Sequence, residues 1–140
     1  SGSSSGARGD AQAAVLDESV TNQRIFRNVL GKGGFAAVAL YEKPHLLIDR
    51  LREERVDLVV GHKQILMPNE FQVLEEIRGF ERDDPLPILV TAYQFTKDEA
   101  IAAIQHGADD LIILPFTPEQ LMEKVAVVTN GVASNLEDFS

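Results

Sequence analysis

Several short apolar runs of this chain end in side chains that can bind an ion or exchange a proton. Asp17 and Glu18 follow the first run, His62 follows the third, and Thr91 follows the fourth. Neighbouring carboxylates attract a cation, and an imidazole serves as charge partner, metal ligand or base near neutral pH. If the runs are strands of one sheet, these residues form a single polar site.

The apolar spacing predicts how these residues are positioned. The runs are continuous rather than alternating, and helical periodicity follows each of them, as in Phe71, Leu74 and Ile77. We predict an α/β fold, a doubly wound five-stranded parallel sheet with five helices, whose strands end at one edge. The predicted strands cover 14–16, 35–41, 57–60, 86–90 and 111–114, and the predicted helices cover 22–30, 44–55, 71–77, 97–106 and 118–128.

The amino-acid composition limits which classes of binding partner and which cellular compartment we expect. A formal charge of -9 argues against nucleic acid, because phosphate contacts need clustered Lys and Arg. The lack of cysteine excludes disulfides and fits a reducing, cytoplasmic location, and no apolar run has the length of a membrane span. We expect a flexible tail at 1–12 (a cloning remnant or a natural linker), one domain at 13–131 and an acidic tail at 132–140.

Four motifs at the predicted strand ends resemble the receiver domain of two-component response regulators. They are Val15-Leu-Asp-Glu-Ser, Asp57-Leu-Val-Val-Gly-His, Thr91-Ala-Tyr and Gly107-Ala-Asp-Asp-Leu-Ile-Ile-Leu-Pro-Phe. The resemblance implies a flavodoxin-like strand order of 2-1-3-4-5. It also implies a signalling module rather than an enzyme, with a sensor kinase, an output domain or another signalling protein as partner.

In that family an aspartate ending the third strand accepts a phosphoryl group from a histidine kinase. An acidic pair holds magnesium, and a hydroxyl residue and a lysine bind the phosphoryl oxygens. The resemblance implies Asp17 and Glu18 as the acidic pair and Thr91 as the hydroxyl. A gapless alignment places His62 at the aspartate and Leu114 at the lysine.

A second alignment, anchored on Met67-Pro68, places Gln64 at the acceptor instead, so neither version supplies an aspartate. An acyl phosphate needs a carboxylate nucleophile and a cation that neutralises the transferred group. We therefore expect a degenerate pseudo-receiver without catalytic residues or cofactor, in which magnesium binding is weak or lost. Its function would be phosphorylation-independent protein–protein interaction, with Leu114 packed as an apolar side chain.

Three alternatives for His62 stay open at this point. It could pair with Asp17 and Glu18 as a counter-charge, join them in a zinc or nickel site, or itself carry a phosphoryl group. The alternative functions are a phospho-accepting regulator with a non-standard residue and a metal-binding regulatory domain. A flavodoxin-like cofactor binder ranks low, because no phosphate-binding loop follows the first strand.

The resemblance also implies a switch and an interaction surface. Receivers switch through the threonine and an aromatic residue of the fifth strand; here Thr91 and Tyr93 end the fourth strand, and Leu111 takes the aromatic's place. The surface that receivers use for outputs and dimers implies these residues, with a homodimer left open: Ala100, Ala103, Ile104, Ile112, Gln120 and Lys124. His45 and His106 are expected to be solvated on helices, and Pro115 to follow a cis bond.

Overall fold

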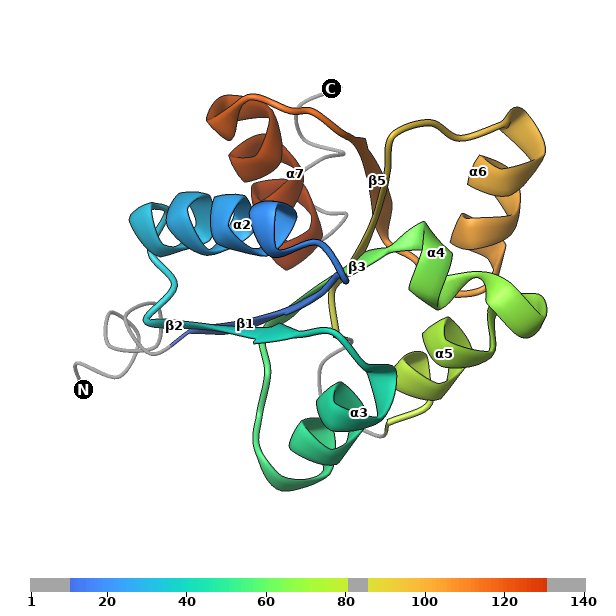
Figure 1. Cartoon of the computed structure of the whole chain (residues 1–140), viewed down its shortest axis with the longest axis horizontal. Helices are drawn as coiled ribbons and strands as arrows, with labels where there is room; N and C mark the ends of the chain where they lie inside the picture. Colours follow the sequence, from blue (N-terminus) through green and yellow to red (C-terminus); the bar gives the residue numbers. More distant parts are fainter. Residues whose placement is uncertain (1–10, 81–85, 131–140) are drawn as a thin grey trace.

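The computed structural model describes residues 11–80 and 86–130, which form five strands and six helices (Figure 1). The strands are β1 (Gln12–Leu16), β2 (Ala37–Tyr41), β3 (Leu58–His62), β4 (Ile88–Ala92) and β5 (Asp110–Ile113). The helices are α2 (Val20–Lys32), α3 (Pro44–Glu53), α4 (Lys63–Leu66), α5 (Pro68–Arg78), α6 (Lys97–Gln105) and α7 (Pro118–Asn130).

All neighbouring strands are parallel, in the order β2-β1-β3-β4-β5. The predicted fold class and strand order are therefore confirmed. Leu16 pairs with Gly61, and His62 pairs with Thr91, so β1, β3 and β4 end at nearly the same level. This alignment gathers the polar residues that follow these strands.

Helices cover both faces of the sheet in two layers. The α2 and α7 helices pack on one face, and α3, α5 and α6 lie on the other (Figure 1). Alternate strand residues face the two layers: Val15 packs with Phe26 and Leu121, whereas Leu16 packs with Leu47 and Leu74 on the opposite side. Burying each such side chain stabilises the fold by about 1.5–3 kcal/mol.

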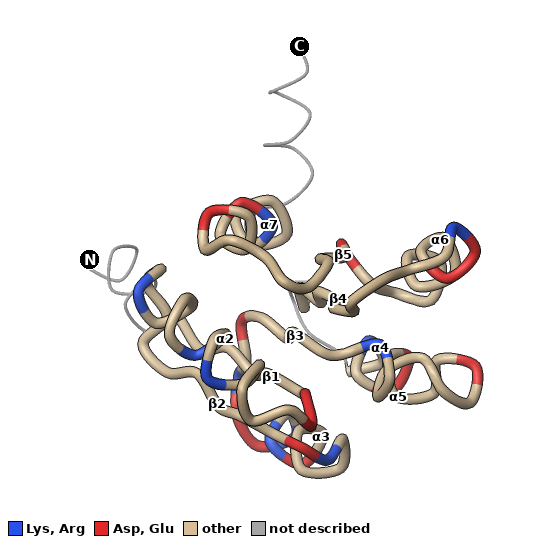
Figure 2. The backbone as a smooth tube through the Cα atoms, turned by 45° about the horizontal axis from the view of Figure 1, so that its top comes forward, with Lys and Arg blue, Asp and Glu red and all other residues tan. Residues whose placement is uncertain are grey.

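Charged residues lie mainly on the helices and connecting loops around the sheet (Figure 2). The central strand β3 is completely buried, which explains its continuous apolar sequence. Within the described ranges, no helix combines the length and apolarity needed to cross a bilayer.

Local signals account for most helix starts. The Ser19 side chain accepts a hydrogen bond from the Asn22 backbone N–H and caps α2. Thr96 and Glu99 form a capping box at α6, in which each side chain accepts the other's backbone N–H. Thr117 caps α7, since its hydroxyl accepts the Gln120 N–H at 3.1 Å.

Two details differ from the sequence expectations. The predicted helix count of five is wrong, because Lys63–Leu66 forms the additional helix α4 where a loop was expected. The strand β1 begins at Gln12, inside the predicted tail, because its backbone N–H donates to Asp57 at 2.8 Å. The rest of that tail up to residue 10, and the predicted tail at 132–140, lie outside the described residues.

The Leu114–Pro115 peptide bond is cis, as the resemblance implied. Between α4 and the regular part of α5, the chain passes through Asn69, Glu70 and Phe71 with φ of 58, 59 and 64°. Left-handed backbone at non-glycine residues costs about 1 kcal/mol or more each. The packing of Phe71 against the sheet accompanies this turn.

Candidate functional site

A pocket of about 280 Å³ opens at the carboxyl ends of β1 and β3. Its walls come from the β1–α2 connection, the first turn of α2, the end of β3, α4 and the segment after β4. The lining residues are Asp17, Glu18, Ser19, Asn22, His62, Gln64, Ile65 and Tyr93. The pocket therefore lies at the sheet edge where ligands of open α/β folds bind.

Asp17 is buried, and each of its carboxylate oxygens accepts a hydrogen bond from a nearby donor. Its Oδ1 accepts the Ser19 backbone N–H at 2.7 Å, and its Oδ2 accepts Asn22 Nδ2 at 3.1 Å. Both donors belong to the start of α2, where the helix dipole also favours a negative charge. Asp17 thus organises the entry into α2, while Glu18 is exposed at the pocket rim.

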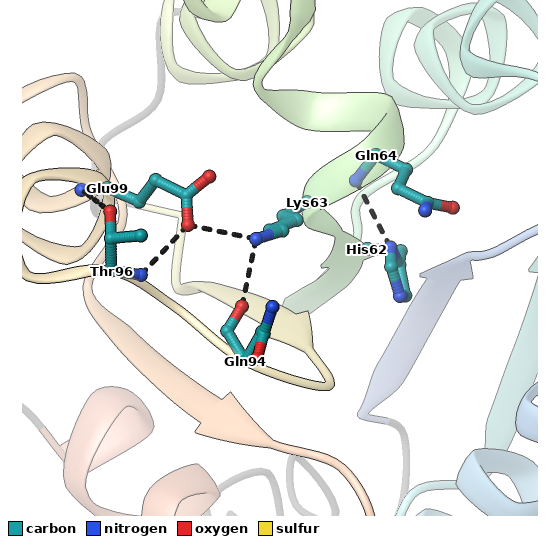
Figure 3. A network of polar contacts seen from close by, with 6 residues as sticks. All are labelled: His62, Lys63, Gln64, Gln94, Thr96 and Glu99. Atoms are coloured by element: carbon teal, nitrogen blue, oxygen red, sulfur yellow. Dashed lines mark hydrogen bonds and ion pairs between the residues drawn. The ribbon is translucent and has the colours of Figure 1, made fainter.

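His62 ends β3 and caps the next helix. Its side chain is only 6% exposed, and its Nδ1 accepts the Gln64 backbone N–H at 3.1 Å (Figure 3). A backbone N–H can only donate, so Nδ1 must offer its lone pair and the ring proton of the neutral imidazole resides on Nε2. The cap fixes the tautomer.

This tautomer bears on the alternatives for His62. Zinc binding or phosphorylation at Nε2 would require a free lone pair there, and moving the proton to Nδ1 would remove the cap of α4. In the described part of the chain, His62 has no hydrogen bond or ion pair with Asp17 or Glu18, so the counter-charge contact, the first of the three alternatives, is not formed. Nor do three His, Asp or Glu side chains among these residues gather as metal ligands.

The donor set also fits magnesium poorly. Magnesium seeks oxygen ligands in near-octahedral geometry. Both oxygens of Asp17 already accept hydrogen bonds, and His62 turns an N–H rather than an oxygen to its surroundings. At the end of β3 the site therefore offers an imidazole N–H where the receiver resemblance would require a carboxylate oxygen for the ion.

Two predicted pocket residues do not line the pocket. Thr91 is completely buried in β4, and its hydroxyl has no hydrogen-bond partner among the described residues. Leu114 is 6% exposed and packs in the apolar layer with Phe26 and Leu121. The structure thus brings together Asp17, Glu18 and His62 of the predicted set.

The predicted switch residues Tyr93 and Leu111 lie in different surroundings. Tyr93 is exposed, lines the pocket and lies with its hydroxyl 3.4 Å from Asn22 Nδ2. Its ring centroid is 6.0 Å from that of His62. Leu111 packs half-buried against the α3, α5 and α6 layer of the core.

Sequence reasoning missed part of the pocket wall. Ser19 could have been found as a helix cap, and Gln64 appeared only through the alternative alignment. Asn22 and Ile65 carry no sequence signal for a pocket. These two residues line the pocket because α2 begins at Val20 and α4 begins at Lys63, which places them in the first turn of each helix.

The predicted interaction surface is wrong at two positions. Ala103 and Ile112 are buried, because α6 turns Ala103 inward and β5 directs Ile112 towards α7. On α6 and β5, the exposed large apolar side chains are Ile101, Ile104 and Ile113, which we call the isoleucine surface.

The other residues of the predicted interaction surface are partly buried or make contacts within the domain. Ala100 is half-buried, while the Gln120 side chain accepts the Thr117 N–H and Lys124 donates to Asp110 at 3.1 Å. His45 is exposed as expected.

The expectation for His106 is wrong. Its ring is half-buried and stacks on Phe71 with centroids 4.2 Å apart, and its Nδ1 contacts Glu75.

Comparison with known proteins agrees with this geometry. The chain matches the profile of the response regulator receiver domain over residues 13–126. The chemotaxis protein CheY1 of Helicobacter pylori is 31% identical over 116 residues, which cover 81% of this chain and 93% of that protein. The chemotaxis protein CheY of Pseudomonas aeruginosa is 27% identical over 118 residues, covering 84% and 95%.

Solved structures give the same result. A response regulator from Thermotoga maritima superposes with a TM-score of 0.78 at 27% identity, covering 87% of this chain and 99% of that one. The receiver domain of a sensor histidine kinase from Pseudomonas aeruginosa, solved with magnesium in its active site cleft, has a TM-score of 0.74 at 16% identity, with coverage of 87% and 99%. That second likeness concerns the fold alone. By profile, relatives and fold, this chain belongs to the family of response regulator receiver domains.

Proposed function

We propose that this receiver domain is a pseudo-receiver, a signalling module that binds protein partners without being phosphorylated and without acting as an enzyme. One observation carries the proposal: the residue that ends β3 beside the acidic pocket is His62, whose Nδ1 is committed to capping α4. The only carboxylates among the lining residues are Asp17 and Glu18. The carboxylate nucleophile that an acyl phosphate requires is missing from this position.

The missing cation supports the same proposal. Leu114 lies in the apolar core where the family's lysine would follow β5. Lys63, the neighbour of His62, directs its ammonium to the Gln94 carbonyl and to Glu99, away from the His62 ring (Figure 3). No lysine or arginine is among the residues that line the pocket, so a transferred phosphoryl group would lack its electrostatic stabilisation.

Binding would use the isoleucine surface. Exposed Ile101 and Ile104 are three residues apart and share one face of α6, and Ile113 is exposed on the edge strand β5. A protein partner would bury these side chains; it could be a sensor kinase, an output domain or another signalling protein. In a homodimer, a second copy of the chain would bury them instead. Nucleic acid is not an expected partner because the formal charge is -9. We expect no cofactor, with magnesium bound weakly at most, and a cytoplasmic location.

A single observation favours the alternative of a phospho-accepting regulator with a non-standard acceptor. The buried Thr91 hydroxyl has no partner in the described part of the chain, and a bound oxyanion would satisfy it. Such a regulator would still need a nucleophile. In His62, Nδ1 accepts the capping hydrogen bond and Nε2 carries the proton, so neither ring nitrogen offers a free lone pair.

Titration with beryllofluoride and magnesium, followed by backbone amide shifts, tests the proposal. The expected result is unchanged shifts for the lining residues, under conditions that fully convert a receiver domain with an intact aspartate and lysine. Saturable shifts at Asp17, His62 and Thr91 would overturn the proposal and favour the phospho-accepting alternative.

A further inference from the structure

Helix α6 is attached to the sheet by little apolar surface. Of its nine residues only Ala103 is buried, while Ile101 and Ile104 point to solvent. The methyl groups of Ala103 and the partly buried Ala102 contribute little burial compared with the leucines and phenylalanines of α2 and α5. Polar contacts at the two ends of α6 must therefore supply much of what holds its position.

At the C-terminal end, α6 is fixed to α5. His106, the C-terminal cap, stacks on Phe71 with parallel rings and contacts Glu75. The Arg78 guanidinium donates to the Gly107 carbonyl at 3.0 Å and to Asp109 at 2.7 Å. Several contacts thus secure this end.

At the N-terminal end, the principal side-chain contact with another element comes from Lys63. Its Nζ lies 2.9 Å from Glu99 Oε1 and 2.9 Å from the Gln94 carbonyl oxygen (Figure 3). The same ammonium lies 5.5 Å from the Phe95 ring centroid. The side chains of Lys63 and Glu99 are 22% and 34% exposed, so water screens this pair less than an open surface pair.

The contact between Lys63 and Glu99 connects α6 to the pocket through two adjacent residues, Lys63 and His62. Lys63 is the first residue of α4, and His62, its cap, lines the pocket. With only four residues, α4 depends strongly on that cap, because an uncapped single turn is unstable. Loss of the cap would free Lys63 to move away from Glu99.

We propose that Lys63 and Glu99 form a latch on the N-terminal end of α6, and that α4 couples this latch to the pocket through the His62 cap. The inference rests on the proposed function, because the latch positions the helix that carries Ile101 and Ile104. A ligand or partner side chain that turns the His62 ring out of its cap would release the N-terminal end of α6. The contacts of His106 and Arg78 would keep the other end in place.

Amide hydrogen exchange on the intact chain tests the latch without any partner. Lys63→Met removes the ammonium, and Glu99→Gln removes the charge while keeping an acceptor for the capping box. Each single variant should accelerate exchange at the Glu99 and Ala100 amides by roughly three- to tenfold, and the double variant should add little. Lys97→Met, a change at an exposed lysine of the same helix, should leave exchange at wild-type rates.

Unchanged rates in both single variants would overturn the latch. Acceleration spread over α2 and α7 as well would also overturn it, since that pattern reports global destabilisation instead of local release.

The coupling to the pocket is tested by two substitutions of the cap. His62→Asn keeps a side-chain oxygen that can cap α4, whereas His62→Ala has none. Exchange at Glu99 and Ala100 should accelerate in His62→Ala and stay near wild-type rates in His62→Asn. Equal rates in wild type and His62→Ala would overturn the coupling. Because no phosphate analogue is involved, failure here is distinct from failure of the proposed function, which the beryllofluoride shifts report.

Discussion

The backbone hydrogen bond accepted by His62 determines what that residue can do. An aspartate would accept the same N–H and cap α4 at least as well, so capping by itself does not require histidine. The two residues differ in what they present to the pocket. An aspartate would add a nucleophilic carboxylate beside Asp17 and Glu18, whereas the neutral imidazole adds an N–H. The histidine thus keeps the cap of α4 but, under our proposal, does not supply the carboxylate that phosphoryl transfer requires.

Leu114 has a purely packing role in this account, and its neighbour provides the control. Leu114 is 6% exposed and Ile113 is 48% exposed. We predict that Leu114→Ala lowers the free energy of unfolding by about 2–4 kcal/mol through lost burial and a cavity. Ile113→Ala should change it by less than about 0.5 kcal/mol. Urea denaturation measures both values, and a nearly neutral Leu114→Ala would show that this side chain does not contribute to the core.

Helix α4 connects the pocket to the rest of the fold, and Gly61 makes room for it. A Cβ atom at Gly61 would lie 2.6 Å from Leu66 Cδ1 and 2.9 Å from its Cγ. Leu66 is fully buried, so it has little freedom to move aside. The absence of a side chain at residue 61 thus allows the last residue of α4 to reach the core.

We predict opposite effects of alanine at two glycines. Gly61→Ala should destabilise the fold by about 1–3 kcal/mol, because the core beside Leu66 is already filled. Gly31→Ala should stabilise it by about 0.5–1 kcal/mol, because Gly31 lies exposed in α2 with no atom within 4 Å of an added Cβ. Thermal or urea unfolding of the two variants gives the sign of each change. Stabilisation by Gly61→Ala would contradict the packing of α4.

The latch at α6 should respond to acid. The Thr96 backbone N–H, followed by the Lys63 ammonium, lowers the pKa of Glu99 from its usual 4.5. A lowered pKa in the folded state means that the carboxylate's contribution is complete above the unfolded value and is lost as the pH falls through the folded value. The charged group that faces Glu99 from α4 is Lys63, and Lys97 and Asp98 are its neighbours on α6.

Exchange at Ala100, corrected for its intrinsic pH dependence, should therefore stay level from neutral pH to about 5 and rise as the pH falls below 4.5. Glu99→Gln should lack this rise. A rise of equal size in wild type and Glu99→Gln would assign the opening to another titrating group.

For the domain as a whole, the sequence was sufficient to predict the strands of the sheet. It was insufficient to predict which apolar side chains would be exposed on the surface. The buried run Leu58-Val-Val and its counterparts predicted the strands, since strands covered on both faces of a parallel sheet have continuous apolar sequences. The Lys63–Leu66 helix escaped prediction because a single helical turn has no periodicity, and its cap is a histidine instead of one of the usual capping residues.

The interaction surface illustrates a second limit. Ile112 and Ile113 are chemically identical neighbours, and only the register of β5 decides that Ile112 is buried and Ile113 exposed. Likewise, α6 buries Ala103 and exposes Ile101 and Ile104, the reverse of what hydrophobicity predicts. Apolar side chains turned outward on α6 and β5 are the surface through which we expect the domain to bind its partner.

Intact-mass spectrometry after incubation with acetyl phosphate and magnesium shows whether the domain accepts a phosphoryl group. We expect a single species of unchanged mass, under conditions that phosphorylate a receiver domain with a complete aspartate and lysine pair, because His62 and Leu114 provide neither nucleophile nor cation. A stoichiometric adduct heavier by one phosphoryl group, on any residue of the pocket, would contradict this expectation.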